Sequence, residues 1–151
     1  AEPLTEGAGR QGIITVDDSQ KLIFPEGLFG FEQFTEYVLF ESEYEPFFWL
    51  QSTEKKALAF LVVDPFLICS DYELDVDDKV LSWIGVSSPA DVFVLSIVTV
   101  PAAGSPITIN LQGPIIVNKK NNNCMQVVVS DSRWGTKHDI LEEMKKRGNL
   151  C

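Results

Sequence analysis

The sequence contains only one histidine, His138, and this scarcity limits the catalytic chemistry that the chain can perform. Nucleophilic catalysis usually pairs a histidine with a serine or a cysteine, and His138 has no such partner at a recognised spacing. The sequence also lacks the GxSxG, HExxH and P-loop motifs of hydrolases, zinc proteases and nucleotide-binding proteins. We therefore expect a protein that is not an enzyme, has no catalytic residues and takes no small-molecule substrate.

Cysteines and long apolar runs are scarce as well. The three cysteines, Cys69, Cys124 and Cys151, are odd in number and far apart, which is typical of reduced thiols rather than of disulfides. No apolar run reaches the roughly 18 residues that a membrane-spanning helix requires. Residues 1–12 have neither a basic region nor an apolar core, so they do not read as a signal peptide. These features predict a cytoplasmic protein that does not bind a membrane.

Basic residues are outnumbered by acidic ones. The chain has 12 lysines and arginines against 22 aspartates and glutamates, a formal net charge of −10, and its isoelectric point is near 4.4. Phosphate backbones and anionic membranes repel such a molecule, so we expect no direct nucleic-acid binding. A basic protein is the better electrostatic match for a partner. Solubility alone also explains an acidic composition, and the sequence leaves that alternative open.

Two short patterns suggest a cofactor or a metal and fail on closer reading. Residues 7–12 match GxGxxG, but a dinucleotide site needs a strand before that motif and a helix after it, and the β-branched residues 13–16 follow. The acidic run 71–78 invites a calcium interpretation. An EF-hand loop starting at residue 71 would need glycine and glutamate where Val76 and Ser82 stand. We expect neither a cofactor nor a metal site.

What the sequence does contain is a strand pattern that changes direction. Within residues 106–118, apolar and polar residues alternate from position 107 to position 112, as in a strand with one buried face. Gly113 and Pro114 interrupt the pattern before an apolar run resumes. Proline has no N–H to give to a strand ladder, so this pair marks a bulge or a sharp corner. A strand that turns a corner and stays apolar lets one sheet wrap into a closed or half-closed barrel.

Strand patterns dominate the rest of the chain. They cover residues 13–16, 21–24, 35–40, 46–51, 57–63, 71–76, 92–100 and 125–129. Asp77 could cap a short helix over residues 78–84. A second helix follows a capping-box pattern from Thr136 to Asp139 near the C-terminus, and its predicted apolar stripe consists of Ile140, Leu141 and Met144.

An acidic segment gives the first candidate binding surface. From the strand predicted at 71–76, three carboxylates project to one face, while apolar residues between them face the protein; these carboxylates, the acidic row, are Asp71, Glu73 and Asp75. Such a row serves either as a solvated strand edge that resists unwanted pairing or as a docking surface for a basic partner. The two roles are compatible.

Residues 14–138 carry a series of short motifs in a distinctive order and spacing. The motifs are FPxG at 24–27 with GF at 30–31, PFFWLQ at 46–51, LAF at 58–60 with DP at 64–65, Tyr72, LSIVT at 95–99, NLxxPI at 110–115 with Asn118, and QVV at 126–128. No single motif is specific. Taken together, they resemble the FliW family of bacterial flagellar assembly factors.

The resemblance implies a fold and a function. The implied fold is all-β and mostly antiparallel: a small, partly open β-barrel with short helices, including one at the C-terminus. Residues 13–151 would form this single domain, after a flexible N-terminal segment at 1–12. FliW-like proteins are non-enzymatic and bind newly made flagellin in the cytoplasm as chaperone-like partners. When flagellin is scarce, they bind CsrA, a small basic repressor of flagellin mRNA translation, and relieve the repression.

The implied partners suggest roles for two surfaces. The acidic row is the candidate contact for basic CsrA, with Glu73 as the first choice. Flagellin's terminal segments are amphipathic helices, which dock through apolar anchors. Consecutive aromatic residues in one strand cannot all face inward, so the candidate flagellin contact is the run Phe47, Phe48 and Trp49.

Two other function classes remain as alternatives. An enzyme on a barrel scaffold would need a pocket with converging polar groups. A nucleic-acid-binding barrel of the OB type would need a basic groove with stacking aromatics, and Lys119 and Lys120 form an exposed-looking basic pair before the C-terminal helix. Binding to flagellin without RNA would favour the FliW interpretation, whereas a salt-dependent shift on RNA would favour the OB alternative.

Overall fold

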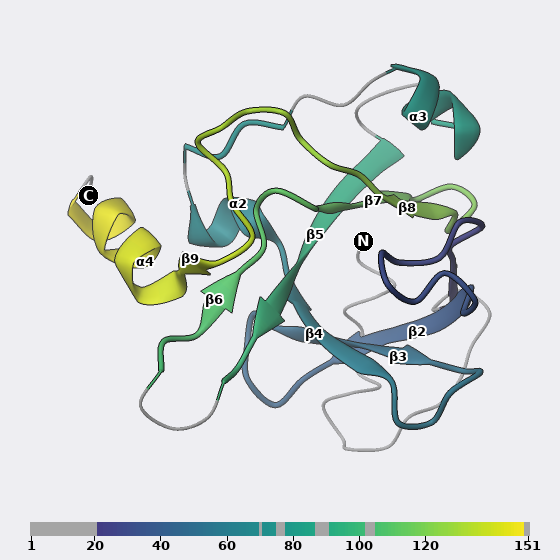
Figure 1. Ribbon diagram of the computed structural model, residues 1–151, viewed down its shortest axis with the longest axis horizontal. Coiled ribbons are helices and arrows are strands. Elements are labelled where there is room, and N and C mark those ends of the chain that lie inside the picture. The colour runs from purple at the N-terminus through teal and green to yellow at the C-terminus, as the bar shows by residue number, and fades with distance from the viewer. Residues whose placement is uncertain (1–20, 70, 75–77, 87–90, 102–104, 150–151) are drawn as a thin grey trace.

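The computed structural model describes residues 21–69, 71–74, 78–86, 91–101 and 105–149. In these ranges, antiparallel strands curl into a nearly closed barrel with three short helices around it (Figure 1). The strands are β1 Lys21–Ile23, β2 Glu36–Glu41, β3 Phe48–Ser52, β4 Ala59–Val63, β5 Val92–Thr99, β6 Thr108–Ile109, β7 Ile115–Asn118, β8 Cys124–Gln126 and β9 His138–Asp139. The helices are α2 Pro65–Ile68, α3 Asp78–Trp83 and α4 Ile140–Asn149. The predicted all-β barrel with a C-terminal helix is confirmed.

The barrel closes through one weak seam. Strands β1 to β5 pair in chain order, β5 also pairs with β7, and β7 pairs with β8. Between β8 and β1 the described contact is a single parallel bridge, Ile23 to Asn123, where the N–H of Ile23 donates to the carbonyl of Asn122 at 2.9 Å. The barrel is therefore partly open at this seam, as expected.

The corner predicted at Gly113 and Pro114 is present. Strands β6 and β7 lie along the same edge of β5, with Ile109 opposite Val98 and Ile115 opposite Leu95. From Ile109 to Ile115 the chain advances by six positions, whereas the partners of these residues on β5 are only three positions apart. Three residues therefore bulge out of the ladder. The side chain of Asn110 stabilises the bulge, because its Oδ1 accepts from the N–H groups of Gln112 at 3.1 Å and Gly113 at 2.8 Å.

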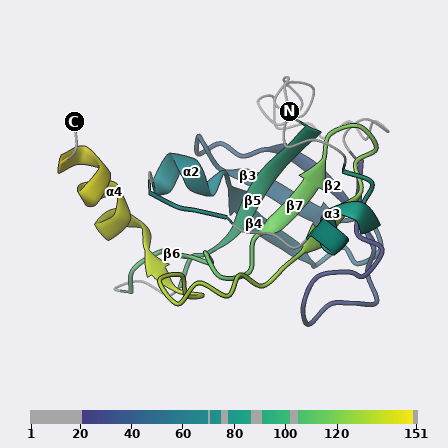
Figure 2. The same ribbon diagram turned by 90° about the horizontal axis from the view of Figure 1, so that it is seen from above.

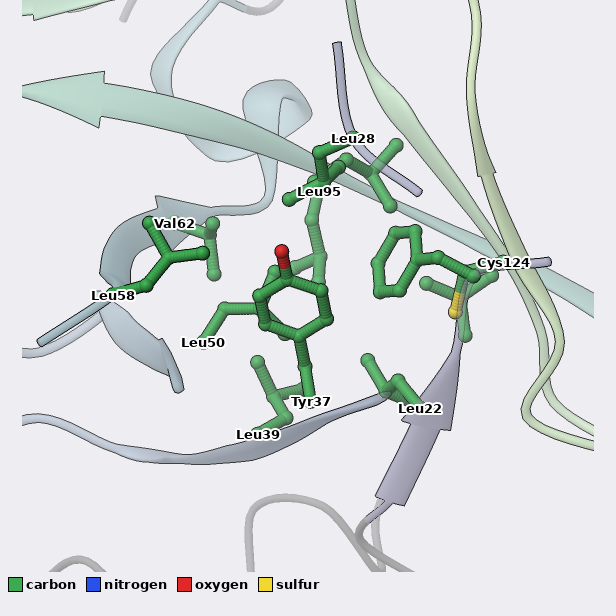
Figure 3. Packing of buried hydrophobic residues seen from close by; sticks show 12 residues of the cluster. Leu22, Leu28, Tyr37, Leu39, Leu50, Leu58, Val62, Leu95 and Cys124 are labelled. Carbon is green, nitrogen blue, oxygen red and sulfur yellow. The ribbon is translucent and has the colours of Figure 1, made fainter. Parts of the chain in front are cut away.

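Strand β5 separates two of the three hydrophobic cores that the described residues form. Its residue Leu95 faces the barrel interior, whereas Val98 faces the opposite side. The barrel core, part of which is shown in Figure 3, consists of Leu22, Phe24, Leu28, Tyr37, Leu39, Leu50, Leu58, Val62, Leu95, Ile115, Val117 and Cys124. The second core consists of Val63, Ile68, Cys69, Tyr72, Val98, Ile109, Leu111, Val129, Trp134 and Ile140. Successive residues of β5 point to opposite faces of the strand, so β5 supplies buried side chains to both of these cores.

The second core ties the corner to the segment that carries the acidic row. The buried hydroxyl of Tyr72 donates to the carbonyl of Leu111 at 2.7 Å. The ring of Trp134 packs edge-on against Tyr72, with 5.0 Å between the centroids. The N–H groups of Leu111 and Gln112 both reach the carbonyl of Gly135, at 3.0 and 3.1 Å. These contacts fix residues 71–74 against the outside of the barrel.

Residues 64–74 differ from the prediction. Residues 65–68 form helix α2 because Asp64 caps it, its Oδ1 accepting from the N–H of Phe66 at 2.9 Å, and because Pro65 suits a first helical position. The prediction of a strand at 71–76 is wrong for residues 71–74, because these residues pair with no strand. Tyr72 is nevertheless buried between exposed Asp71 and exposed Glu73, so the predicted in–out alternation is present. Residues 75–77 lie outside the described ranges, as do 1–20.

The C-terminal helix is rotated from the expected position. Asp139 is its capping residue in place of Thr136, since its Oδ1 accepts from the N–H groups of Leu141 and Glu142. Ile140 is buried, whereas Leu141 and Met144 of the predicted stripe are exposed. Pairing of β9 with β6 immediately before the helix sets this rotation. None of the helices in the described ranges is long and apolar enough to cross a membrane.

Two buried tyrosines allow a matched test of the second core. Removing the hydroxyl of Tyr72 leaves the Leu111 carbonyl without that donor, so Tyr72→Phe should lower the free energy of unfolding by about 1–2 kcal/mol. The hydroxyl of Tyr37 is buried in the barrel core and has no hydrogen-bond partner among the described residues. Tyr37→Phe should therefore change stability by less than about 0.5 kcal/mol or increase it. Urea denaturation measures both, and equal losses would contradict this assignment.

Candidate functional site

The described part of the acidic row lies at the surface next to helix α2. Asp71 and Glu73 are both exposed, and 74% of the Glu73 side chain is accessible to solvent. Asp75 lies outside the described residues. Figures 1 and 2 both place α2 and α4 at one end of the molecule and α3 at the other, so this surface belongs to the α2 and α4 end.

Glu73 already has a basic partner within the molecule. The Nη2 atom of Arg133 lies 2.7 Å from Glu73 Oε1 and 2.7 Å from Asp131 Oδ2. The guanidinium group also lies over the ring of Trp134, 5.0 Å from its centroid. Hydrogen bonds from Arg133 hold the pKa of Asp131 below its ordinary value. Two carboxylates thus share one arginine, and this surface keeps a net negative charge.

Sequence reasoning did not find Arg133 or Asp131. They are about 60 positions from Glu73 in the chain, and the second core brings the two segments together through Tyr72 and Trp134. The DSR sequence at 131–133 contains a short turn signal, since Asp131 Oδ1 accepts from the N–H of Arg133. Nothing in that signal identifies Glu73 as a partner.

Asp71 takes part in a different cluster from Glu73. The thiol of Cys69 donates to Asp71 Oδ1 at 3.0 Å. Helix α4 contributes Glu143 to this cluster. The Cys69 sulfur and one carboxylate oxygen each from Asp71 and Glu143 all lie within 4.8 Å of one another. Burial, the hydrogen bond to Asp71 and the charge of Glu143 raise the pKa of the Cys69 thiol to about 12. Of the described residues, these three are a set that could hold a metal ion.

His138 supports this cluster. Its Nε2 atom lies 2.7 Å from the backbone nitrogen of Gly135 and accepts its hydrogen, so the neutral ring carries its proton on Nδ1. Nδ1 lies 3.2 Å from Glu143 Oε2 and donates to it. The single histidine therefore positions the carboxylate of Glu143.

The predicted aromatic run divides between the two cores. Phe48 packs against the barrel core, and Phe47 packs against the second core. Trp49 lies on the outer face of β3, because Leu50 beside it faces the barrel interior. All three side chains are partly exposed.

Trp49 belongs to an apolar row that the sequence did not reveal. It pairs across the ladder with Phe40 of β2 and Leu61 of β4, and directly paired residues lie on the same face of a sheet. All three side chains are partly exposed, so the outer face of β2 to β4 presents apolar surface. We refer to Phe40, Trp49 and Leu61 as the outer apolar row.

A small pocket of about 260 Å³ lies beside the open seam. It is lined by Pro25, Glu26, Trp83, Ile84, Cys124 and Met125. Glu26 is the one carboxylate in this lining, and burial raises the pKa of the Cys124 thiol well above its ordinary value. This lining lacks the converging polar groups that an active site requires.

Known proteins resemble this chain over most of its length. The family model described as FliW protein matches residues 7–140. A flagellar assembly factor FliW of Treponema denticola is 51% identical over 137 residues, covering 91% of this chain and 93% of that protein. One of Treponema pallidum is 48% identical, covering 90% and 91% respectively.

A solved structure agrees with the sequence comparisons. A crystal structure of the flagellar assembly factor FliW superposes with a TM-score of 0.76 at 32% sequence identity, covering 84% of this chain and 89% of that one. The partly open barrel, the corner at Gly113 and the motif order therefore have one explanation: the chain belongs to the FliW family of flagellar assembly factors.

Proposed function

We propose that this protein is a cytoplasmic, non-enzymatic binding protein that captures flagellin and antagonises CsrA, and so relieves repression of flagellin mRNA translation. Membership of the FliW family supports a role with protein partners in flagellar assembly. The observation that carries the finer proposal is the presence of two surfaces with different chemistry. One is acidic and exposed around Glu73, and the other is the outer apolar row.

The acidic surface suits a basic regulator. A net charge of −10 attracts a positively charged partner and repels RNA. The protein would therefore bind the RNA-binding regulator itself and not the mRNA that this regulator represses. Arg133 limits this attraction, because it neutralises part of the charge of Glu73 and Asp131. CsrA would share these carboxylates with Arg133 or displace it.

The outer apolar row suits an amphipathic helix. Helix-in-groove docking uses a few apolar anchors, and aromatic residues contribute most to such contacts. Trp49 is central in the row, between Phe40 and Leu61 on the neighbouring strands. Phe47 and Leu61 also pack against the second core, which contains Tyr72 and Trp134 next to Glu73. The two proposed surfaces thus border one core.

The acidic surface can be tested with opposite charge changes. Glu73→Lys replaces attraction by repulsion and should abolish CsrA binding, while Arg133→Gln removes the competing cation and should strengthen CsrA binding several-fold. Calorimetry with purified CsrA at low and high salt measures both, and binding should weaken as salt screens the charges. Flagellin binding should be unchanged in both variants. Folded Glu73→Lys protein that binds CsrA normally would rule out this surface.

The apolar surface can be tested at Trp49. Trp49→Ala should weaken flagellin capture by about tenfold or more, because a central aromatic anchor typically contributes 2 kcal/mol or more to binding. Val128→Ala is the matched control, since Val128 is an exposed apolar residue outside the row. Phe47→Ala and Phe48→Ala should also lose affinity, together with stability, because both side chains pack against cores. If Trp49→Ala folds and captures flagellin as well as the control does, flagellin binds elsewhere.

A further inference from the structure

A thiol and two carboxylates meet where helix α2 ends and helix α4 begins. Cys69 is the C-cap residue of α2, Asp71 follows two residues later, and Glu143 lies in the first turn of α4. Their donor atoms lie within 4.8 Å of one another, with 3.0 Å between Cys69 Sγ and Asp71 Oδ1. Ligands of a tetrahedral zinc ion lie about 3–4 Å apart, given Zn–S and Zn–O bonds of about 2.3 and 2.1 Å. Small side-chain rotations would therefore complete the geometry.

The surroundings of the cluster fit a metal site. Cys69 is 1% exposed and Glu143 is 7% exposed, whereas Asp71 is exposed and gives the cluster an opening to solvent. His138 Nδ1–H donates to Glu143 Oε2, and Gly135 fixes the histidine ring from the other side. Metal-binding carboxylates are typically held by such outer hydrogen bonds.

We propose that Cys69, Asp71 and Glu143 form a binding site for a zinc-like divalent cation, with water in the fourth position. The thiolate favours zinc over the hard cations calcium and magnesium, which prefer oxygen ligands alone. On binding, the thiol proton leaves to solvent and Cys69 Sγ coordinates the metal. The ion would join the C-terminal end of α2 to α4 and stabilise that end of the molecule.

Cobalt provides a direct test, because Co²⁺ replaces Zn²⁺ and shows a charge-transfer band only with a thiolate ligand. The full-length protein, freed of metal with a chelator, should develop this near-ultraviolet band together with visible bands of four-coordinate Co²⁺, and Zn²⁺ should displace both. Cys69→Ser should lose the band, while Cys124→Ser, which changes a buried thiol of the barrel core, should keep it.

Asp71→Asn is a second test variant, and it should not disturb the fold because Asp71 is exposed. This variant should fold normally by circular dichroism and bind Co²⁺ about tenfold or more weakly, since even supporting residues of metal sites typically contribute 10- to 100-fold. Zn²⁺ should raise the melting temperature of the wild type more than that of Asp71→Asn. Absence of a thiolate band in the wild type, a band that survives Cys69→Ser, or an unchanged affinity in Asp71→Asn would overturn the proposal.

Discussion

The buried hydrogen bond from Tyr72 to the carbonyl of Leu111 is the contact on which the arrangement of the candidate sites depends. Leu111 lies in the bulge between β6 and β7, where backbone groups leave the strand ladder and need other partners. Tyr72 and Gly135 supply those partners. The same contacts hold residues 71–74 against residues 133–135 and so bring Glu73 to Arg133. A bulge that helps to wrap the barrel thereby also places charged residues at the surface.

Arg133 neutralises part of the charge at this surface, which stays net negative. Glu73 and Asp131 share Arg133, and Asp71 accepts a hydrogen bond from Cys69, so the two described carboxylates of the acidic row have different roles. Exposed ion pairs contribute little to stability. The Arg133 contacts therefore matter more for the proposed attraction of a basic partner than for the fold.

Local chemistry explains what the sequence could predict. Alternation and the Gly113–Pro114 pair located the corner, and most strands followed from their apolar patterns, because these signals act between neighbouring residues. Long-range packing explains what was missed. Helix α2 consists of four apolar residues, and the start of this helix depends on the cap at Asp64. Helix α4 is rotated from the predicted orientation because β9, directly before it, pairs with β6. Glu73 with Arg133, Cys69 with Glu143, and the outer apolar row each join distant segments, and no pattern in one sequence records such pairs.

We propose that two separate surfaces bind two partners, and the three tryptophans of the sequence can report on this binding directly. Trp134 lies beneath Arg133, Trp49 lies in the outer apolar row, and Trp83 lines the pocket at the seam. Nuclear magnetic resonance of the ¹⁵N-labelled protein follows each indole N–H during titration with CsrA or flagellin. CsrA should shift the Trp134 signal first, flagellin should shift the Trp49 signal first, and the Trp83 signal should respond least. A response to both partners at Trp83 alone would contradict it.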